Sequence, residues 1–155
     1  MGTLYVVGTP IGNMEDVTFR QLETLKSVDF IAAEDTRVTL KLLNRYGIKK
    51  TLVSYHRHSG ENCALSIMER IKNGENAAIV TDAGMPCISD PGEDLVKICA
   101  ENEVDVKVVP GPSAVISALA VSGLSTSRFS FEGFLSVNKK PVSYTHLTLP
   151  TNSRV

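Results

Sequence analysis

Five strand-like runs alternate with helical stretches along this chain, and this alternation restricts the possible fold more than any other feature. Each run is short and apolar, and each is followed by a stretch with the hydrophobic periodicity of a helix. The runs cover residues 4–8, 28–33, 52–56, 77–82 and 104–109. Strands that alternate with helices predict parallel pairing in one sheet. The sequence therefore predicts an α/β fold, with a Rossmann-like parallel sheet and helices on both faces.

The stretches between these runs carry signals for helix starts and ends. Thr18 and Gln21 form a capping box, which predicts a helix that ends near Ser27. Asp90 and Glu93 stand in the same relation at the start of a later helix. Asp90 is therefore expected to cap that helix.

Two further helices carry expectations about packing. In a helix over about residues 37–46, Val38, Leu40 and Leu43 are expected to point inward. The helix that begins at Pro112 has a face of small residues. Such a face predicts that this helix lies close to the sheet or to a cofactor.

Changes in composition predict the domain organisation. Residues 1–123 should form an N-terminal α/β domain, and residues 124–140 a linker and the start of a truncated second domain. Alternating apolar residues at 129–135 predict the first strand of that second domain. Residues 141–155 are rich in Thr and resemble translated vector sequence, so we interpret them as a non-native tail.

Composition bounds the class of protein. The chain has 155 residues, 43% of them hydrophobic, and a net charge of -1. This charge lacks the strongly basic footprint of proteins that bind nucleic acid by charge alone, but it does not exclude RNA. Three widely spaced cysteines suit reduced thiols in a cytoplasmic protein. No apolar run approaches the roughly 20 residues that cross a bilayer, so no membrane association is expected.

The His-rich segment predicts no metal site. His56 and His58 are followed by Cys63, a spacing that matches no usual zinc motif. A solvated polar loop is the simpler interpretation, although His56 and Arg57 could contact a substrate.

Five loops follow the five expected strands, and they contain more Gly, Pro and charged residues than simple connections require. They cover residues 8–13, 34–37, 56–58, 82–90 and 110–113. The carboxyl ends of parallel strands lie together, so these loops should converge on one crevice. In the fourth loop, Gly84 would let backbone amides approach a ligand closely.

Structural roles compete with ligand binding in these loops. Residues 8–13 match neither the dinucleotide nor the Walker A pattern, and they could form only a tight turn. Glu34 could accept a proton from a hydroxyl group, whereas Asp35 could instead cap the next helix. Free amides after residues 110–113 suit an adenosine or carboxylate group, or serve only helix packing.

Several motifs together resemble one known family. They are Gly-Thr-Pro-Ile-Gly-Asn at 8–13, Ala-Ala-Glu-Asp-Thr-Arg at 32–37, Thr-Asp-Ala-Gly-Met-Pro at 81–86, Val-Pro-Gly-Pro at 109–112 and Phe-Glu-Gly-Phe-Leu at 131–135. Their order and spacing resemble the ribosomal RNA small subunit methyltransferase I family of the tetrapyrrole methylase superfold, over about residues 3–138. Met85 departs from the resemblance, because the family is expected to have Thr there.

The resemblance implies an activity and its partners. These are S-adenosylmethionine-dependent 2'-O-ribose methylation of a cytidine in 16S ribosomal RNA, within the small ribosomal subunit, by a protein that is a homodimer at full length. The residues implied for the cofactor are Thr9, Pro10, Asp82, Ala83, Gly84, Met85, Ile88, Ser113 and Ala114. The candidates for the general base are Glu34, Asp35 and His56. The candidates for contact with RNA phosphates are Arg37, Arg57, Lys139 and Lys140.

Two other interpretations stay open at this point. The chain could methylate a tetrapyrrole or another small molecule with the same superfold. It could also be a non-catalytic fragment that binds the cofactor or dimerises.

Overall fold

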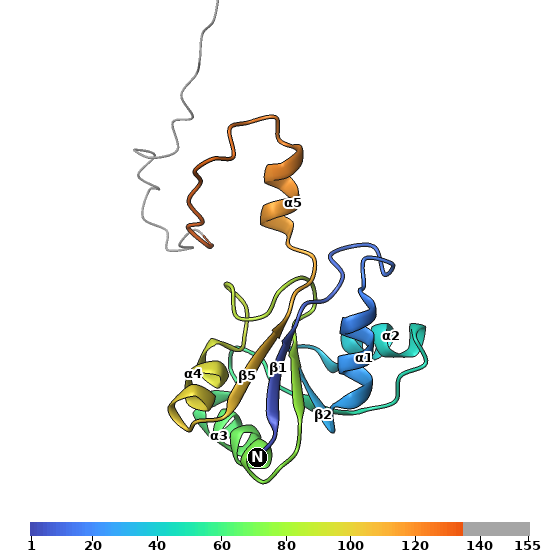
Figure 1. Cartoon of the computed structure of the whole chain (residues 1–155), viewed down its shortest axis with the longest axis vertical. Coiled ribbons are helices and arrows are strands. Elements are labelled where there is room, and N and C mark those ends of the chain that lie inside the picture. Colours follow the sequence, from blue (N-terminus) through green and yellow to red (C-terminus); the bar gives the residue numbers. More distant parts are fainter. Residues whose placement is uncertain (135–155) are drawn as a thin grey trace, which may run out of the picture.

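The computed structural model describes residues 1–134, and a parallel sheet of five strands forms its centre. The strands are β1 (Thr3–Val7), β2 (Phe30–Ala33), β3 (Thr51–Ser54), β4 (Ala77–Val80) and β5 (Asp105–Val109). They are arranged in the order β3-β2-β4-β1-β5, and each neighbouring pair is parallel. The predicted α/β class and parallel sheet are confirmed (Figure 1).

Helices cover both faces of this sheet, as the sequence predicts. The helices are α1 (Phe19–Ser27), α2 (Thr36–Arg45), α3 (Gly60–Lys72), α4 (Glu93–Glu101) and α5 (Ala114–Val121). The pairs α1 with α2 and α3 with α4 lie on opposite faces (Figure 1), and each pair packs into its own hydrophobic core.

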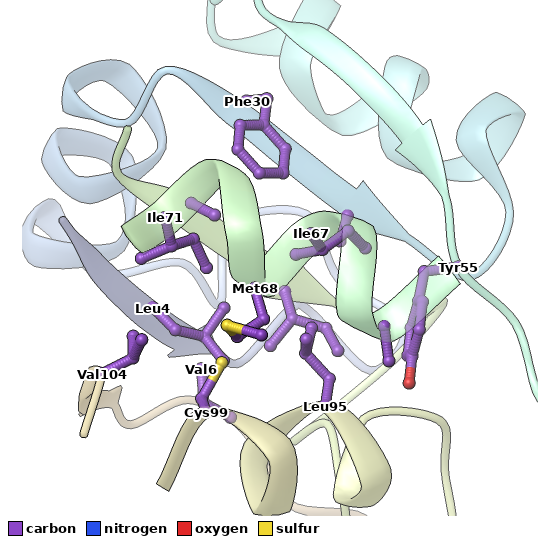
Figure 2. Close-up of a cluster of buried hydrophobic side chains, with 14 residues drawn as sticks. Leu4, Val6, Phe30, Tyr55, Ile67, Met68, Ile71, Leu95, Cys99 and Val104 are labelled. Carbon is purple, nitrogen blue, oxygen red and sulfur yellow. The ribbon is translucent and has the colours of Figure 1, made fainter. Parts of the chain in front are cut away.

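The two cores follow from the alternation of side chains along each strand. In β2, Phe30 and Ala32 enter the core of α3 and α4, while Ile31 and Ala33 enter the core of α1 and α2. Figure 2 shows the first core, where Leu4 of β1 lies among side chains of α3 and α4. Strands that are buried on both faces need continuous apolar runs.

Helix caps agree with the sequence at two positions. Thr18 and Gln21 form the predicted capping box, and α1 ends at Ser27. Asp35 caps α2, because its side chain accepts a hydrogen bond from the backbone N–H of Arg37. The structural alternative for Asp35 is therefore confirmed.

The predicted cap at Asp90 is wrong. Helix α4 begins at Glu93 with Gly92 as its N-cap, and no side chain caps it. The backbone N–H of Cys87 donates to the carbonyl of Pro91, which closes the preceding loop. Gly92 then turns the chain into the helix with a φ of 126°, a conformation that favours glycine.

The inward face predicted for α2 is only partly correct. Leu43 is buried, but Leu40 is exposed. Thr39 and Leu42 are buried in its place, because the helix presents a slightly rotated face to the sheet.

Helix α5 departs most from expectation. None of its residues is buried, and it projects away from the sheet (Figure 1). Of the two expectations for its small face, packing on the sheet is therefore wrong, and proximity to a cofactor stays a prediction. The strand expected at 129–135 is absent over residues 129–134, since nothing within the described part of the chain pairs with this segment. The expected tail at 141–155 lies outside the described residues.

The strand order creates a crevice at one edge of the sheet. Neighbouring strands β1 and β4 continue into helices on opposite faces, α1 and α4. The loops after β1 and β4 therefore diverge at a topological switch point, where ligands of open α/β sheets bind. Within residues 1–134, no helix is both long and apolar enough to cross a membrane.

Candidate functional site

The loops after β1 and β4 are joined directly by hydrogen bonds. The N–H of Thr9 donates to the carbonyl of Gly84 at 2.9 Å, and the N–H of Gly84 donates to the carbonyl of Thr9 at 3.1 Å. The hydroxyl of Thr9 also donates to the carbonyl of Thr81 at 3.1 Å. These bonds fix the two loops relative to each other at the switch point.

The loop after β5 packs against the same place. A Cβ atom added to Gly8 would lie 2.7 Å from Cα of Gly111 and 2.8 Å from Sδ of Met85. Side-chain Nε2 of Gln21 donates to the carbonyl of Gly8 at 2.8 Å. The loops after β1, β4 and β5 therefore meet at one place, as the sequence analysis expects.

A pocket of about 310 Å³ opens between the loops after β1 and β4 and helix α2. It is lined by Thr9, Pro10, Ile11, Gly12, Met14, Val38, Thr39, Leu42, Thr81, Asp82 and Ala83. Four of the residues predicted to bind the cofactor thus line one pocket. Thr81 is 3% exposed, and its hydroxyl is the one buried side-chain polar atom in the described residues without a hydrogen-bond partner.

The other five residues predicted to bind the cofactor do not line this pocket. Gly84 has a φ of 84°, and a Cβ atom added there would lie 3.7 Å from the carbonyl oxygen of Pro112. Met85 packs partly on the core, Ile88 is exposed, and Ser113 caps α5 next to Ala114. Four predicted residues therefore lie on the α2 side of the loop after β4, and four lie toward the loop after β5, whereas Ile88 is exposed.

Glu34 and Asp82 are coupled across neighbouring strand ends. The N–H of Asp82 donates to Oε2 of Glu34 at 3.4 Å, and the N–H of Asp35 donates to Oδ1 of Asp82 at 3.2 Å. Partial burial raises the pKa of Glu34. The hydrogen bond from the Asp82 amide opposes this shift, and the negative charges of Asp82 and Asp90 add to it.

The other two candidate bases are less suited to accept a proton. The hydrogen bonds from Arg37 lower the pKa of Asp35 to about 2, and Asp35 also caps α2. Nδ1 of His56 accepts a hydrogen bond from the N–H of His58 at 3.2 Å, and the residue is exposed. His56 lines a different pocket, of about 540 Å³, between the loop after β3 and α4.

The candidate RNA contacts are also distributed. Nη2 of Arg37 pairs with Oδ2 of Asp35 at 2.6 Å, and the Arg37 side chain is 87% exposed. Nη2 of Arg57 donates to the carbonyl of Ser89 at 2.8 Å. Lys139 and Lys140 lie outside the described residues.

Residues from α2 and the end of β4 were not identified from the sequence. Thr81, Val38, Thr39 and Leu42 line the pocket, but their pattern is that of ordinary buried positions. Of these four residues, only Thr81 could have been identified from the sequence, because it lies between a buried strand and a Gly-rich loop. Within residues 1–134, no group of three or more His, Cys, Asp or Glu side chains could hold a metal ion.

Comparison with known proteins identifies a protein family that this chain matches. Residues 3–149 match the family model described as Tetrapyrrole (Corrin/Porphyrin) Methylases. Among curated relatives, "Ribosomal RNA small subunit methyltransferase I" of Thermotoga maritima is 55% identical over 135 residues, which are 87% of this chain and 61% of that protein. The protein of the same name from Bacillus subtilis is 52% identical over 140 residues, 90% of this chain and 48% of that protein. The chain thus spans about half to three fifths of the length of these relatives.

Solved structures agree on the fold. The uroporphyrin-III-C-methyltransferase of Thermus thermophilus matches with a TM-score of 0.60 and 21% identity, over 83% of this chain and 55% of that one. A diphthine synthase matches with a TM-score of 0.63 and 17% identity, over 84% of this chain and 52% of that one. At these identities the likeness concerns the fold alone.

Proposed function

This chain belongs to the tetrapyrrole methylase family, and we propose that it is part of an S-adenosylmethionine-dependent methyltransferase that acts on a cytidine 2'-hydroxyl in 16S ribosomal RNA. The identity of 55% to a relative named for methylation of small-subunit ribosomal RNA carries this proposal. The similarity extends over 135 residues, which are 87% of the chain. In this proposal, residues 1–123 form the cofactor-binding domain of a cytoplasmic protein that is dimeric at full length.

The residues at the switch point fit the implied cofactor. The carboxylate of Asp82 forms no ion pair within residues 1–134, and its Oδ1 accepts only the N–H of Asp35 there. It can therefore hold the ammonium group of a methionine moiety. S-adenosylmethionine, when bound, supplies a methyl group that its sulfonium centre already activates.

On the β5 side of the same loop, Gly84, Met85, Ser113 and Ala114 would hold the rest of the cofactor. The positive φ of Gly84 and its closeness to Pro112 bring backbone groups of two loops together. Ile88, which is exposed, would cover the ligand from the outer edge.

Glu34 is the group best suited to take the proton from the ribose hydroxyl. Burial raises its pKa, so it binds a proton more readily than an ordinary carboxylate does. Its position beside Asp82 places it next to the proposed cofactor site. Orientation of the hydroxyl would supply much of the rate, because the methyl group is already activated.

The basic side chains would contribute contacts to phosphates. Arg37 is exposed at the start of α2, on the same rim as Glu34. Arg57 holds the loop at Ser89 and could exchange that contact for a phosphate. We also propose Lys139 and Lys140 as contacts to RNA phosphates.

The first test is calorimetric titration of S-adenosylmethionine into the chain, with Asp82→Ala and Gly84→Val as variants and the exposed Lys72→Ala as control. We expect saturable binding in the native chain and the control, and a loss of at least about tenfold in affinity for both variants, equal to about 1.4 kcal/mol. Native binding with no loss in either variant would contradict the proposed site.

The second test is methyl transfer to isolated small ribosomal subunits, with the methyl position mapped by resistance of the RNA to alkaline cleavage. Transfer to a cytidine ribose supports the proposal, and Glu34→Gln should then reduce turnover with little change in cofactor affinity. Transfer to a tetrapyrrole instead would favour the small-molecule alternative. Cofactor binding without any transfer would favour the non-catalytic alternative.

A further inference from the structure

The loop after β4 has ligand-facing residues on two sides, and the proposed function uses mainly one of them. Gly84 and Met85 face the loop after β5. Thr81 borders the pocket of about 310 Å³ on the α2 side, together with Val38 and Leu42 of α2. This pocket therefore lies beside the proposed cofactor site, with the Thr9–Gly84 hydrogen bonds between the two.

Thr81 has a feature that fold stability does not explain. Its hydroxyl is buried and has no partner, although buried polar groups are normally hydrogen-bonded. A hydroxyl left in this state costs free energy, so Val would serve the fold better at this position. Thr81 lines an open pocket, so rotation about its Cα–Cβ bond would turn the buried hydroxyl toward a ligand that supplies the missing partner.

The walls of the pocket indicate the chemistry of that ligand. Ile11, Met14, Val38 and Leu42 present apolar surface, and the nearly buried Thr39 adds a second side chain with a hydroxyl group opposite the loop. An apolar pocket with a few hydroxyl groups suits a flat heterocycle with hydrogen-bonding groups on its edge. Enzymes that act on an extruded nucleotide hold its base in this way, between apolar side chains and by hydrogen bonds to the edge of the base.

The pocket shares one wall with the proposed cofactor site. Thr9, Pro10, Asp82 and Ala83 line it, whereas the other predicted cofactor residues, Gly84, Met85, Ile88, Ser113 and Ala114, lie outside it. The N–H of Asp82 donates to Glu34, so the candidate general base lies at the edge that the two sites share. A nucleotide whose base enters the pocket would bring its ribose toward this edge.

We propose that this pocket receives the cytosine base of the acceptor nucleotide, and that Thr81 is a specificity-determining residue that hydrogen-bonds to the edge of this base. This inference rests on the proposed function, because it names the place where that substrate binds. The Thr81 hydroxyl donates to the ring nitrogen or carbonyl of cytosine, and Thr39 lies within the same pocket to accept from its amino group.

The test is methyl-detected NMR of the chain, titrated separately with cytidine 5'-monophosphate and S-adenosylhomocysteine. Thr81→Val removes the hydroxyl while keeping the shape, and the exposed Thr51→Val is the matched control. We expect the nucleotide to shift the methyl signals of Ile11, Val38 and Leu42 saturably. Thr81→Val should weaken the nucleotide about tenfold and leave the affinity for S-adenosylhomocysteine within about twofold, whereas Thr51→Val should change neither.

Two outcomes would overturn the inference. If S-adenosylhomocysteine shifts the same methyl signals and is weakened by Thr81→Val, the pocket belongs to the cofactor, and the proposed function survives. If the nucleotide leaves these signals unchanged, the pocket is not a base site. Failure of the proposed function itself would appear separately, as absence of cofactor binding or of methyl transfer. Thermal unfolding of Thr81→Val, expected to be at least as stable as the native chain, shows that the variant folds.

Discussion

At the residue scale, Glu34 combines a candidate catalytic role with a cost in stability. Burial raises the pKa of Glu34 above its ordinary value of 4.5, so the folded chain binds this proton more tightly than the unfolded chain does. The contribution of Glu34 to the free energy of unfolding is therefore most favourable at low pH, and it is lost as the pH rises above 4.5. Such a trade-off between activity and stability is common at functional sites.

We therefore predict that Glu34→Gln raises the free energy of unfolding at pH 7 and that the gain disappears below about pH 4. The gain should stay below about 0.5 kcal/mol, because water screens a largely accessible carboxylate. Denaturant unfolding at pH 7 and below about pH 4 measures this gain in the free energy of unfolding. The control is Glu69→Gln on the exposed face of α3. A variant that is less stable than the native chain at pH 7 would show that the native carboxylate is favoured instead.

At the scale of elements, Gln21 joins α1 to the loop after β1. Its side chain is fully buried, accepts from the N–H of Thr18 and donates from Nε2 to the carbonyl of Gly8. A Cβ atom added to Gly111 would lie 2.4 Å from this Nε2, so the loop after β5 also packs here. The cap of one helix thus holds two of the site's loops in place.

Gln21→Glu should keep the cap and break the bond to the loop, because a carboxylate has no N–H to donate. We expect a loss of about 2–3 kcal/mol in the free energy of unfolding, since a charged oxygen then faces the buried carbonyl of Gly8. Hydrogen exchange at the amide of Thr9 should also become faster. The control is Glu23→Gln in the exposed Glu23–Lys26 pair, which should change stability by less than about 0.5 kcal/mol. Equal effects of the two changes would contradict a role of Gln21 in holding the loop.

At the scale of the whole molecule, the segment from α5 to residue 134 exposes apolar side chains that a packed domain would cover. The exposed residues include Ile116, Val121, Leu124, Phe129 and Phe134, with Val121 at 86% exposure. The chain also spans only about half to three fifths of the length of its relatives. Apolar surface of this kind marks an interface.

We predict that the chain on its own associates in a concentration-dependent way through this surface, measurable by sedimentation velocity. Replacing Val121 and Leu124 together with Glu should shift the distribution toward the monomer, because burying charge opposes association. Leu40→Glu is the control, since Leu40 is also exposed but lies on α2. Monomeric behaviour of the native chain at all concentrations would contradict the prediction.

The sequence by itself determined the five strands, the burial of β2 and β4 on both faces and the start of α1, but not the buried face of α2 or the packing of α5. Continuous apolar runs in β2 and β4 require burial on both faces, and Thr18 with Gln21 defines the start of α1. These features depend on neighbours within a few residues, so the sequence contains them directly. The same holds for the family motifs, which form contiguous segments.

Only the tertiary structure decided which loops meet and what they do there. Strand order places β4 between β2 and β1, and this brings Thr9 to Gly84 and Asp35 to Asp82, pairs that are 75 and 47 residues apart. The unpartnered hydroxyl of Thr81 and the projection of α5 depend on surroundings that no local pattern specifies. Local periodicity determines how each segment folds, whereas the packing of distant segments determines the chemistry of the site.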